Sequence, residues 1–225
     1  MNPQHAAAPV RSWLIRPLPV DVAQSIERLR QAEDVQHVAV MPDIHLANEV
    51  CVGLAVATHR LIYPAAVGSD LGCGMAAVGF EAEAGLLADE RAAARMLARM
   101  YRHIPSIKHR PEAAPAALPT NLQAGSLSAA CLEKMRDRDG RFQLGTLGRG
   151  NHFVELQADP HDRLWLMVHS GSRGLGQAIS AHHLKKARAE GQTDKLVSFD
   201  AESPAGQAYL SDVGWAVDYA EQNRL

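Results

Sequence analysis

The sequence predicts an α/β fold, with α+β as the alternative, in which a buried central sheet is flanked by helices. Short runs rich in β-branched and small residues recur in the first third of the chain and again over residues 151–169. Longer segments with apolar residues at helical spacing separate and follow these runs. The chain has 225 residues and is 47% hydrophobic, enough to bury the core of one large domain or two small ones. We predict that residues 1–225 form the N-terminal part of a single domain.

The first half of the chain alternates the two patterns. A helix is predicted over residues 20–33, with Asp21 as its cap, followed by a buried strand over 36–41 that ends at Pro42. Further extended segments are predicted over 50–59, 60–68 and 75–81, and a helix of strong helix formers over 85–103. Four prolines then fall between Pro105 and Pro119, so residues 104–124 are predicted to form a surface excursion without regular structure.

The second half begins with a predicted helix over residues 126–137 and then becomes rich in glycine. Strands are predicted over 151–157 and 163–169, and helices over 174–190 and 203–225. The last helix has neither a C-cap glycine nor a polar tail, which we expect of a cut within a longer chain rather than of a natural terminus.

Composition limits the function classes. The net charge of −2 gives no global attraction to nucleic acid, so RNA binding would need a local basic surface. The basic groups at residues 108–110 and 185–188 are interpreted as solvated faces. Three cysteines without CxxC spacing indicate no disulfide framework. No apolar run is long enough to cross a bilayer. Residues 1–13 lack the basic and then apolar layout of a signal peptide. These features predict a cytoplasmic protein without a membrane partner.

Three glycine-rich motifs carry candidate metal ligands. GSDLGCGM places Asp70 and Cys73 three residues apart in a loop that can turn tightly. GTLGRGNHFVE places His152 between a glycine-rich loop and a strand, and HSGSRG places His169 at the end of an apolar strand. Taken singly, each residue is better explained as a buried or loop-capping side chain.

Together the three motifs predict a metal site, because each puts a ligand at the edge of a glycine-rich loop beside a strand. A thiolate, two imidazoles and a carboxylate can bind one or two transition metals, and this donor set by itself favours zinc or cobalt. After His169, the turn offers Arg173 and backbone N–H groups to a phosphate, or Arg173 pairs with a nearby carboxylate. In MPDIH, Asp43 and His45 are either second-shell partners of the ligands or turn residues.

The motifs MPDIH, PAAVGSDLGCGM, LGTLGRGNHFVE and HSGSRGLG occur in the order seen in the RtcB family of RNA-splicing ligases, which the chain resembles from about residue 38 to its end. The resemblance implies a GTP-dependent ligase that joins RNA 3′-phosphate or 2′,3′-cyclic phosphate ends to 5′-hydroxyl ends. It also implies two Mn²⁺ ions, a guanylylated histidine that passes GMP to the RNA, substrates such as tRNA halves or broken RNA, and an archease-type activator.

The resemblance also implies roles for single residues. Asp70 and His152 would bind one Mn²⁺, His169 the other, and Cys73 would bridge the two ions. The residues implied to contact the guanine nucleotide are Asn151, His152, Phe153, Val154 and Glu155. Arg173 would hold an RNA phosphate.

The sequence departs from the family pattern in three places. LANEV replaces the usual glycine-rich continuation of MPDIH, and Arg149 stands where a glycine is common. The third departure is an absence: the chain ends before the segment that should supply another histidine ligand, the nucleotide loops and the guanylylated histidine. His182 and His183 do not match the motif of the guanylylated histidine, which we therefore expect beyond Leu225. The chain alone is expected to be inactive as a ligase. A metal-dependent phosphoesterase and a non-catalytic relic that binds metal and RNA remain as alternatives.

Overall fold

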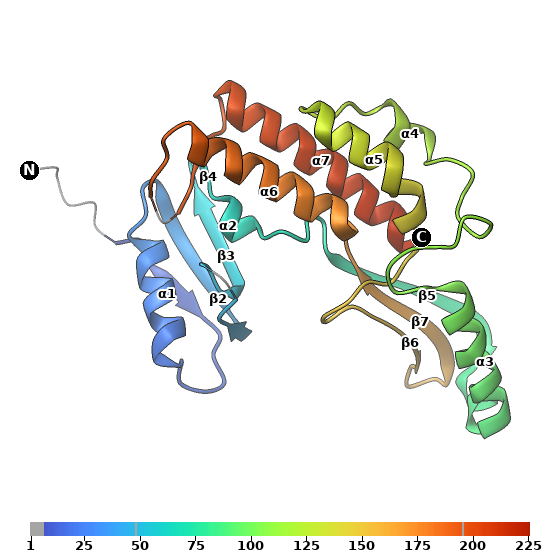
Figure 1. Cartoon of the computed structure of the whole chain (residues 1–225). Coiled ribbons are helices and arrows are strands. Elements are labelled where there is room, and N and C mark those ends of the chain that lie inside the picture. Colours follow the sequence, from blue (N-terminus) through green and yellow to red (C-terminus); the bar gives the residue numbers. More distant parts are fainter. Residues whose placement is uncertain (1–6, 48, 195) are drawn as a thin grey trace, which may run out of the picture. The chain divides into compact units, whose positions relative to one another are not determined.

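The computed structural model describes residues 7–47, 49–194 and 196–225. The chain forms two compact units, Met1–Ser69 with Ser180–Leu210 and Asp70–Ile179 with Ser211–Leu225 (Figure 1). The single domain predicted from the sequence stays a prediction. Two of the sequence segments discussed above, residues 1–13 and LANEV, fall partly outside the described residues, at positions 1–6 and 48.

The first unit contains two small sheets. A three-stranded sheet has the order β1-β2-β3, with β1 parallel and β3 antiparallel to β2, and β4 pairs with β8 in an antiparallel ribbon. The elements of this unit are β1 (Val10–Ser12), α1 (Val20–Arg30), β2 (Val35–His45), β3 (Val52–Thr58), β4 (Leu61–Ile62), α2 (Pro64–Val67) and β8 (Phe199–Asp200).

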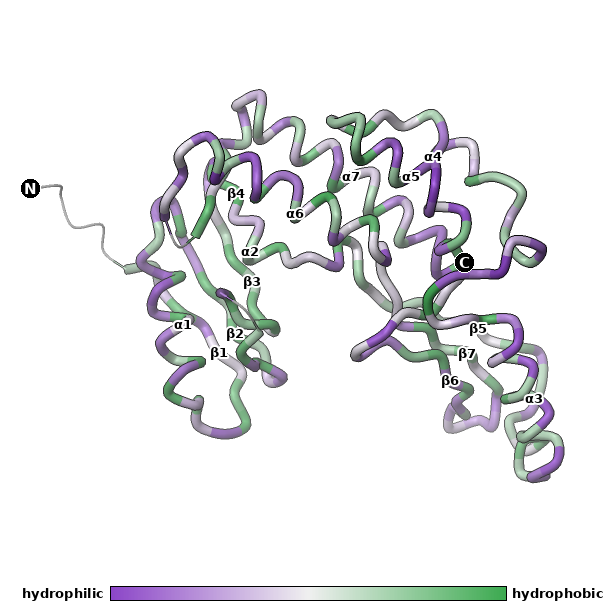
Figure 2. The backbone as a smooth tube through the Cα atoms, viewed as in Figure 1, coloured by the Kyte–Doolittle hydropathy of each residue, from purple (hydrophilic) through white to green (hydrophobic). Residues whose placement is uncertain are grey.

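Helix α1 forms because its apolar residues recur on one face. Val22, Ile26 and Leu29 are buried, and Val22 and Ile26 join a core with Val38 and Val40 of β2 and other residues. Figure 2 shows the matching hydrophobic run along β3. The predicted cap was wrong: Pro19 is the N-cap, and Asp21 lies in the first turn, where its Oδ1 accepts a hydrogen bond from Val22 N at 2.9 Å.

The second unit contains one antiparallel sheet of order β5-β7-β6. Its other elements are helical, and α6 and α7 have residues in both units. The bounds are β5 (Gly74–Glu83), the 3₁₀ helix η1 (Ala84–Ala88), α3 (Glu90–His103), α4 (Thr120–Ala124), α5 (Ala130–Gln143), β6 (Phe153–Ala158), β7 (Arg163–Ser170), α6 (Arg173–Ala189) and α7 (Pro204–Arg224).

The predicted α/β class is confirmed, but the strands are not arranged in one buried central sheet. Among the described residues they form three separate small sheets, and β5 leaves Met75 and Val78 51% and 53% exposed. The core of the second unit lies mainly among helical residues, including Leu122, Ile179 and Tyr219. Large apolar side chains on α4, α6 and α7 pack against one another, so the sheet is not needed to bury them.

Several elements differ from the prediction. Within residues 60–68, predicted to be extended, Pro64–Val67 form α2; the helix predicted over 85–103 is divided into η1 and α3; and the helix predicted over 126–137 is α5, Ala130–Gln143. Residues 120–124 form α4, so the segment 104–124 is irregular only up to Pro119. Strand β2 continues through Pro42 to His45, because its register shifts between Val40 and His45 and no ladder hydrogen bond is required of the proline. Strand β6 begins at Phe153, after His152. In the described part of the chain, no helix is both long and apolar enough to cross a bilayer.

Two fully buried tyrosines provide a matched test of the packing. Tyr219 donates a hydrogen bond to Gly140 O at 2.8 Å, whereas the Tyr209 hydroxyl has no hydrogen-bond partner among the described residues. We expect Tyr219→Phe to lower the free energy of unfolding by about 1–2 kcal/mol and Tyr209→Phe to leave it unchanged or raise it by up to about 1 kcal/mol. Urea unfolding of both variants measures this, and equal losses would contradict it.

Candidate metal centre

Three side chains from separate segments meet at one end of the sheet in the second unit. Cys73 Sγ lies 3.1 Å from His169 Nε2 and 3.4 Å from His152 Nε2. The three ligand atoms all lie within 4.8 Å of one another. A thiolate and two imidazoles at this spacing are a suitable donor set for a transition-metal ion.

The register of the sheet brings these residues together. On the central strand β7, His169 pairs with Met75 of β5 on one side and with Phe153 of β6 on the other. Cys73 comes two residues before Met75, and His152 comes immediately before Phe153. The loops that enter β5 and β6 therefore place their ligands on either side of His169.

Glycines allow the three loops to approach so closely. A Cβ at Gly171 would collide with the Asp70 carboxylate, and a Cβ at Gly148 would collide with the side chains of His152 and Arg173. Gly148 also has a φ of +107°, a backbone conformation that favours glycine. The glycine-rich character of the motifs is thus required by the packing of the ligands themselves.

Asp70 lies beside the cluster. Its Oδ2 is 2.7 Å from His152 Nε2, and Ser172 Oγ donates to its Oδ1 at 3.5 Å. The Asp70 side chain is 29% exposed, while that of His152 is only 4% exposed. The carboxylate therefore adjoins the cluster on the His152 side, where it could complete the coordination of an ion.

The hydrogen bonds of the two imidazoles differ. Asn151 O lies 3.2 Å from His169 Nδ1, so Nδ1 donates to this carbonyl and the Nε2 lone pair is available toward Cys73. The ring of Phe153 meets that of His169 edge-on, with 5.6 Å between centroids. At His152, Nδ1 lies 3.0 Å from the Arg173 guanidinium, which can only donate. Without a cation, His152 Nε2 then carries the proton and faces the Asp70 carboxylate. Coordination through Nε2 would require this proton to move to Nδ1 and the Arg173 contact to change.

The thiol of Cys73 is held in its neutral form without a cation. Burial raises its pKa to about 11, with a further contribution from Asp70, while Arg224 and Arg173 act in the opposite direction. A bound cation would reverse this balance, because metal coordination stabilises the thiolate. The site therefore fits a metal ion, and binding must release a proton.

The released proton leads to a pH prediction. Since the thiol is protonated below a pKa of about 11, raising the pH lowers the cost of forming the thiolate ligand. The apparent metal affinity should increase about tenfold for each pH unit between about pH 7 and pH 9. Calorimetric titration at several pH values, in two buffers of different ionisation enthalpy, measures the affinity and the protons released. An affinity independent of pH would contradict a thiolate ligand.

A cavity of about 350 Å³ adjoins the cluster. Its lining includes two arginines, Arg149 and Arg173, with Asp70, Asn151 and His152. Arg173 adopts a φ of +60°, and its Nε also donates to Thr146 Oγ1 at 3.3 Å. Burial lowers the pKa of its guanidinium. Two guanidinium groups beside a cation-binding cluster can hold a phosphate group.

Other predicted residues are placed less closely around the cluster. Val154 is half-buried in β6, and Glu155 is exposed and accepts a hydrogen bond from Gln157. Asp43 and His45 are exposed at the end of β2, where Asp43 O lies 2.8 Å from His45 Nδ1. They belong to the first unit, so their proposed contact with the metal ligands stays a prediction.

Two residues that support the site were missed from the sequence. Asn223, at the end of α7, accepts hydrogen bonds from Gly145 N and Thr146 N and donates to Thr146 O and Ser170 Oγ. Its neighbour Arg224 donates to Gly72 O at 2.7 Å and Ser170 O at 3.0 Å. In the sequence, Asn223 and Arg224 are two polar residues at the end of a predicted helix. This pattern is the same as that of a helix terminus exposed to solvent.

The fold and the site define an α/β protein with a cluster of candidate metal ligands and an arginine-lined cavity beside it. A family model described as tRNA-splicing ligase RtcB matches residues 25–225. The chain belongs to the RtcB family of RNA-splicing ligases.

Individual relatives agree with this assignment. RNA-splicing ligase RtcB of Escherichia coli K12 is 34% identical over an alignment that covers 96% of this chain and 58% of that protein. RNA-splicing ligase RtcB of Mycobacterium tuberculosis H37Rv is 35% identical over 44% of this chain and 29% of its own length. The chain therefore spans well under two thirds of the length of these relatives.

Proposed function

We propose that this chain supplies the metal-binding part of a GTP- and Mn²⁺-dependent RNA ligase. The reaction joins RNA 3′-phosphate or 2′,3′-cyclic phosphate ends to 5′-hydroxyl ends, as in tRNA splicing and RNA repair. The observation that carries the proposal is the cluster of Cys73, His152 and His169, formed by motifs of the family to which the chain belongs. We also propose a cytoplasmic location, where a thiolate ligand stays reduced, and an archease-type activator.

The geometry supports a division of the ligands between two ions. Asp70 Oδ2 contacts His152 Nε2, and Cys73 Sγ contacts both imidazoles, so Cys73 would be the ligand shared by two ions. We assign Asp70 and His152 to one Mn²⁺ and His169 to the other. When bound, two such cations neutralise phosphate charge during phosphoryl transfer. The choice of Mn²⁺ over Zn²⁺ rests on the family, since the donor set alone would favour Zn²⁺.

The cavity beside the cluster supports a nucleotide or RNA-phosphate site. Asn151 and His152 line it, which favours the proposed contact of residues 151–155 with guanine nucleotide. Arg173 lines the same cavity, and its guanidinium donates to His152 Nδ1. A phosphate that contacts Arg173 would therefore lie close to the metal ligands. Within residues 151–155, exposed Glu155 is the member with the least support from the contacts.

One set of assays on the 225-residue chain tests the proposal. With Mn²⁺ present, a short RNA ending in a 3′-phosphate should bind about tenfold more tightly than the same RNA ending in a 3′-hydroxyl, because the cavity receives the terminal phosphate. We expect no covalent labelling by GTP, since His152 and His169 are assigned as ligands and His182 and His183 do not match the nucleophile's motif.

Three results would change the assignment. Stable guanylylation of this chain would show that it contains the nucleophile. Mn²⁺-dependent release of phosphate from the RNA 3′ end would favour a metal-dependent phosphoesterase, which needs no nucleotide. Equal binding of the two RNAs would leave metal and RNA binding without recognition of the 3′-phosphate and would favour the non-catalytic alternative.

A further inference from the structure

We propose that one face of α3 binds the phosphate backbone of RNA and leads the strand to the metal centre. This face, the α3 arginine stripe, consists of Arg91, Arg95, Arg99 and Arg102. The inference rests on the proposed function, because it takes RNA as the substrate of the neighbouring site.

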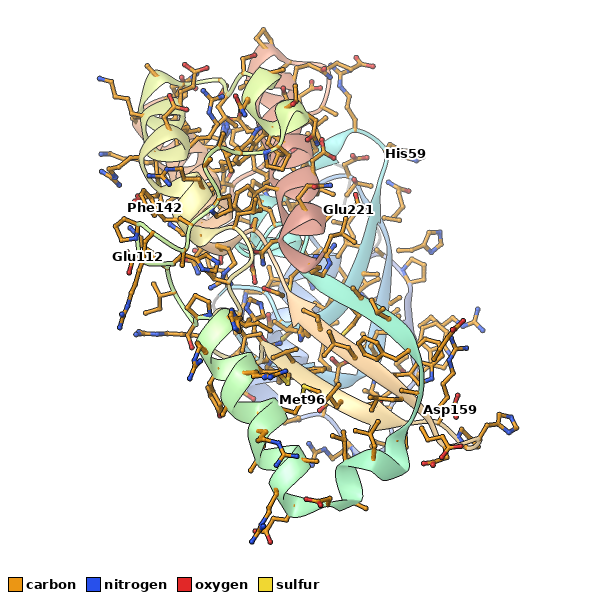
Figure 3. The ribbon with its side chains drawn as sticks, turned by 90° about the vertical axis from the view of Figure 1, so that its right-hand side faces the viewer. His59, Met96, Glu112, Phe142, Asp159 and Glu221 are labelled. Carbon is orange, nitrogen blue, oxygen red and sulfur yellow. The ribbon has the colours of Figure 1, made fainter. Side chains whose placement is uncertain are left out.

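The four arginines share one side of the helix. At 100° per residue they fall within an arc of about 80° and extend over about 17 Å along the axis. All four are exposed, whereas Ala92, Ala93, Met96 and Met100 are half-buried on another side. Figure 3 shows Met96 projecting from α3 toward the sheet, and in Figure 2 hydrophilic and hydrophobic residues alternate along the helix.

The positive charge of the stripe is not neutralised within the described part of the chain. None of the four guanidinium groups makes a hydrogen bond or ion pair there. On α5, by contrast, Arg136 pairs with Asp137, and Arg138 pairs with Asp139. In a chain of net charge −2, four unpaired arginines on one helix face form a local basic surface of the kind that RNA binding requires.

The stripe ends at the edge of the metal centre. Directly after α3, Pro105 O accepts a hydrogen bond from Leu147 N at 3.0 Å, and Ser106 O accepts one from Gly148 N at 2.9 Å. These contacts attach the end of α3 to the glycine-rich loop that carries His152. Ile107, one residue further, lines the cavity beside the cluster. A strand held on the stripe would therefore reach the cavity at its end.

The chemistry of the helix favours RNA over an anionic membrane. The guanidinium fork matches phosphate oxygens, and Tyr101, which is 83% exposed on the flank of the stripe, offers a ring for base stacking. A helix that lies in a membrane interface needs a free apolar face. The methionines of α3 are half-buried, and the large apolar side chains that the helix leaves exposed are only Leu97 and Tyr101, which do not make a continuous apolar face.

The test is the salt dependence of RNA binding. A quadruple variant replaces each stripe arginine by glutamine, which preserves helix propensity. Its matched control replaces four exposed cations of the first unit, Arg16, Arg28, Lys185 and Lys186, by glutamine. Fluorescence anisotropy with a short single-stranded RNA is recorded over a range of salt concentrations, together with Mn²⁺ titration of each variant.

We expect the stripe variant to lose at least about tenfold in affinity at about 0.1 M salt and the slope of log K against log salt to fall by about 3. The control should change affinity less than about twofold, and Tyr101→Ala should weaken binding without changing the slope. Unchanged RNA binding by the stripe variant, or an equal loss in the control, would overturn the inference. So would stripe-dependent binding to phosphatidylserine vesicles without an effect on RNA.

Failure of the proposed function is distinguishable from failure of this inference. If the parent chain binds no Mn²⁺, or binds 3′-phosphate and 3′-hydroxyl RNA equally, the proposed function fails whatever the stripe does. If Mn²⁺ and 3′-phosphate dependence persist while the stripe variant binds RNA like the parent, only the inference fails.

Discussion

Replacing Cys73 by alanine should lower the affinity for Mn²⁺ or Zn²⁺ by about 100-fold or more, beyond the loss that follows from removing an outer-shell partner. The reason is that Cys73 Sγ contacts the imidazoles of His169 and His152, at 3.1 and 3.4 Å, and is the ligand atom common to both contacts. Without it, His152 and His169 cannot be joined through a common ligand. Metal content after dialysis and calorimetric titration measure the effect.

The control is Cys131→Ala, which removes an exposed cysteine on α5 and should leave metal binding within about twofold of the parent. Circular dichroism checks that both variants remain folded. A Cys73→Ala variant that binds metal like the parent would remove the bridging ligand from the proposal. Gly171→Ala offers a second test. The added Cβ would displace the Asp70 carboxylate, although all four proposed ligand residues are retained.

Replacing Asn223 by alanine should lower the free energy of unfolding by about 2–4 kcal/mol. The side chain is 6% exposed and makes four hydrogen bonds, two as acceptor and two as donor. Its removal leaves the backbone at Gly145 and Thr146 and the hydroxyl of Ser170 without these partners. Because Ser170 follows His169, metal affinity should also fall about tenfold. Urea unfolding and metal titration of the same sample measure both effects.

The matched control is Asn121→Ala, at an exposed position of α4, where the change in stability should stay within about 0.5 kcal/mol. Asn223→Asp keeps both acceptor bonds but replaces the donor, so it should restore only part of the stability. If Asn223→Ala unfolds like the parent, the end of α7 does not hold the glycine-rich loop in place.

Much of the fold could be predicted because its signals are local. The helix at α3 and the strand at β7 follow from the spacing and type of neighbouring residues, and both lie where the sequence placed them. The exposure of the strands could not be predicted, since apolar strand residues do not show whether a helix covers them. Met75 and Val78 have the composition of a core strand and are nonetheless exposed.

The metal ligands were predicted as a set from their shared setting at glycine-rich loop edges and from the family motifs. By itself, the sequence determined the residue types, the loops that carry them and the family, because these are properties of contiguous segments. Only the tertiary structure decided that Cys73 lies between the two imidazoles, that Asn151 O orients His169, and that Asn223 ties the loop to α7. Each of these depends on strand register or helix packing between segments distant in the chain, and no local pattern encodes such distances.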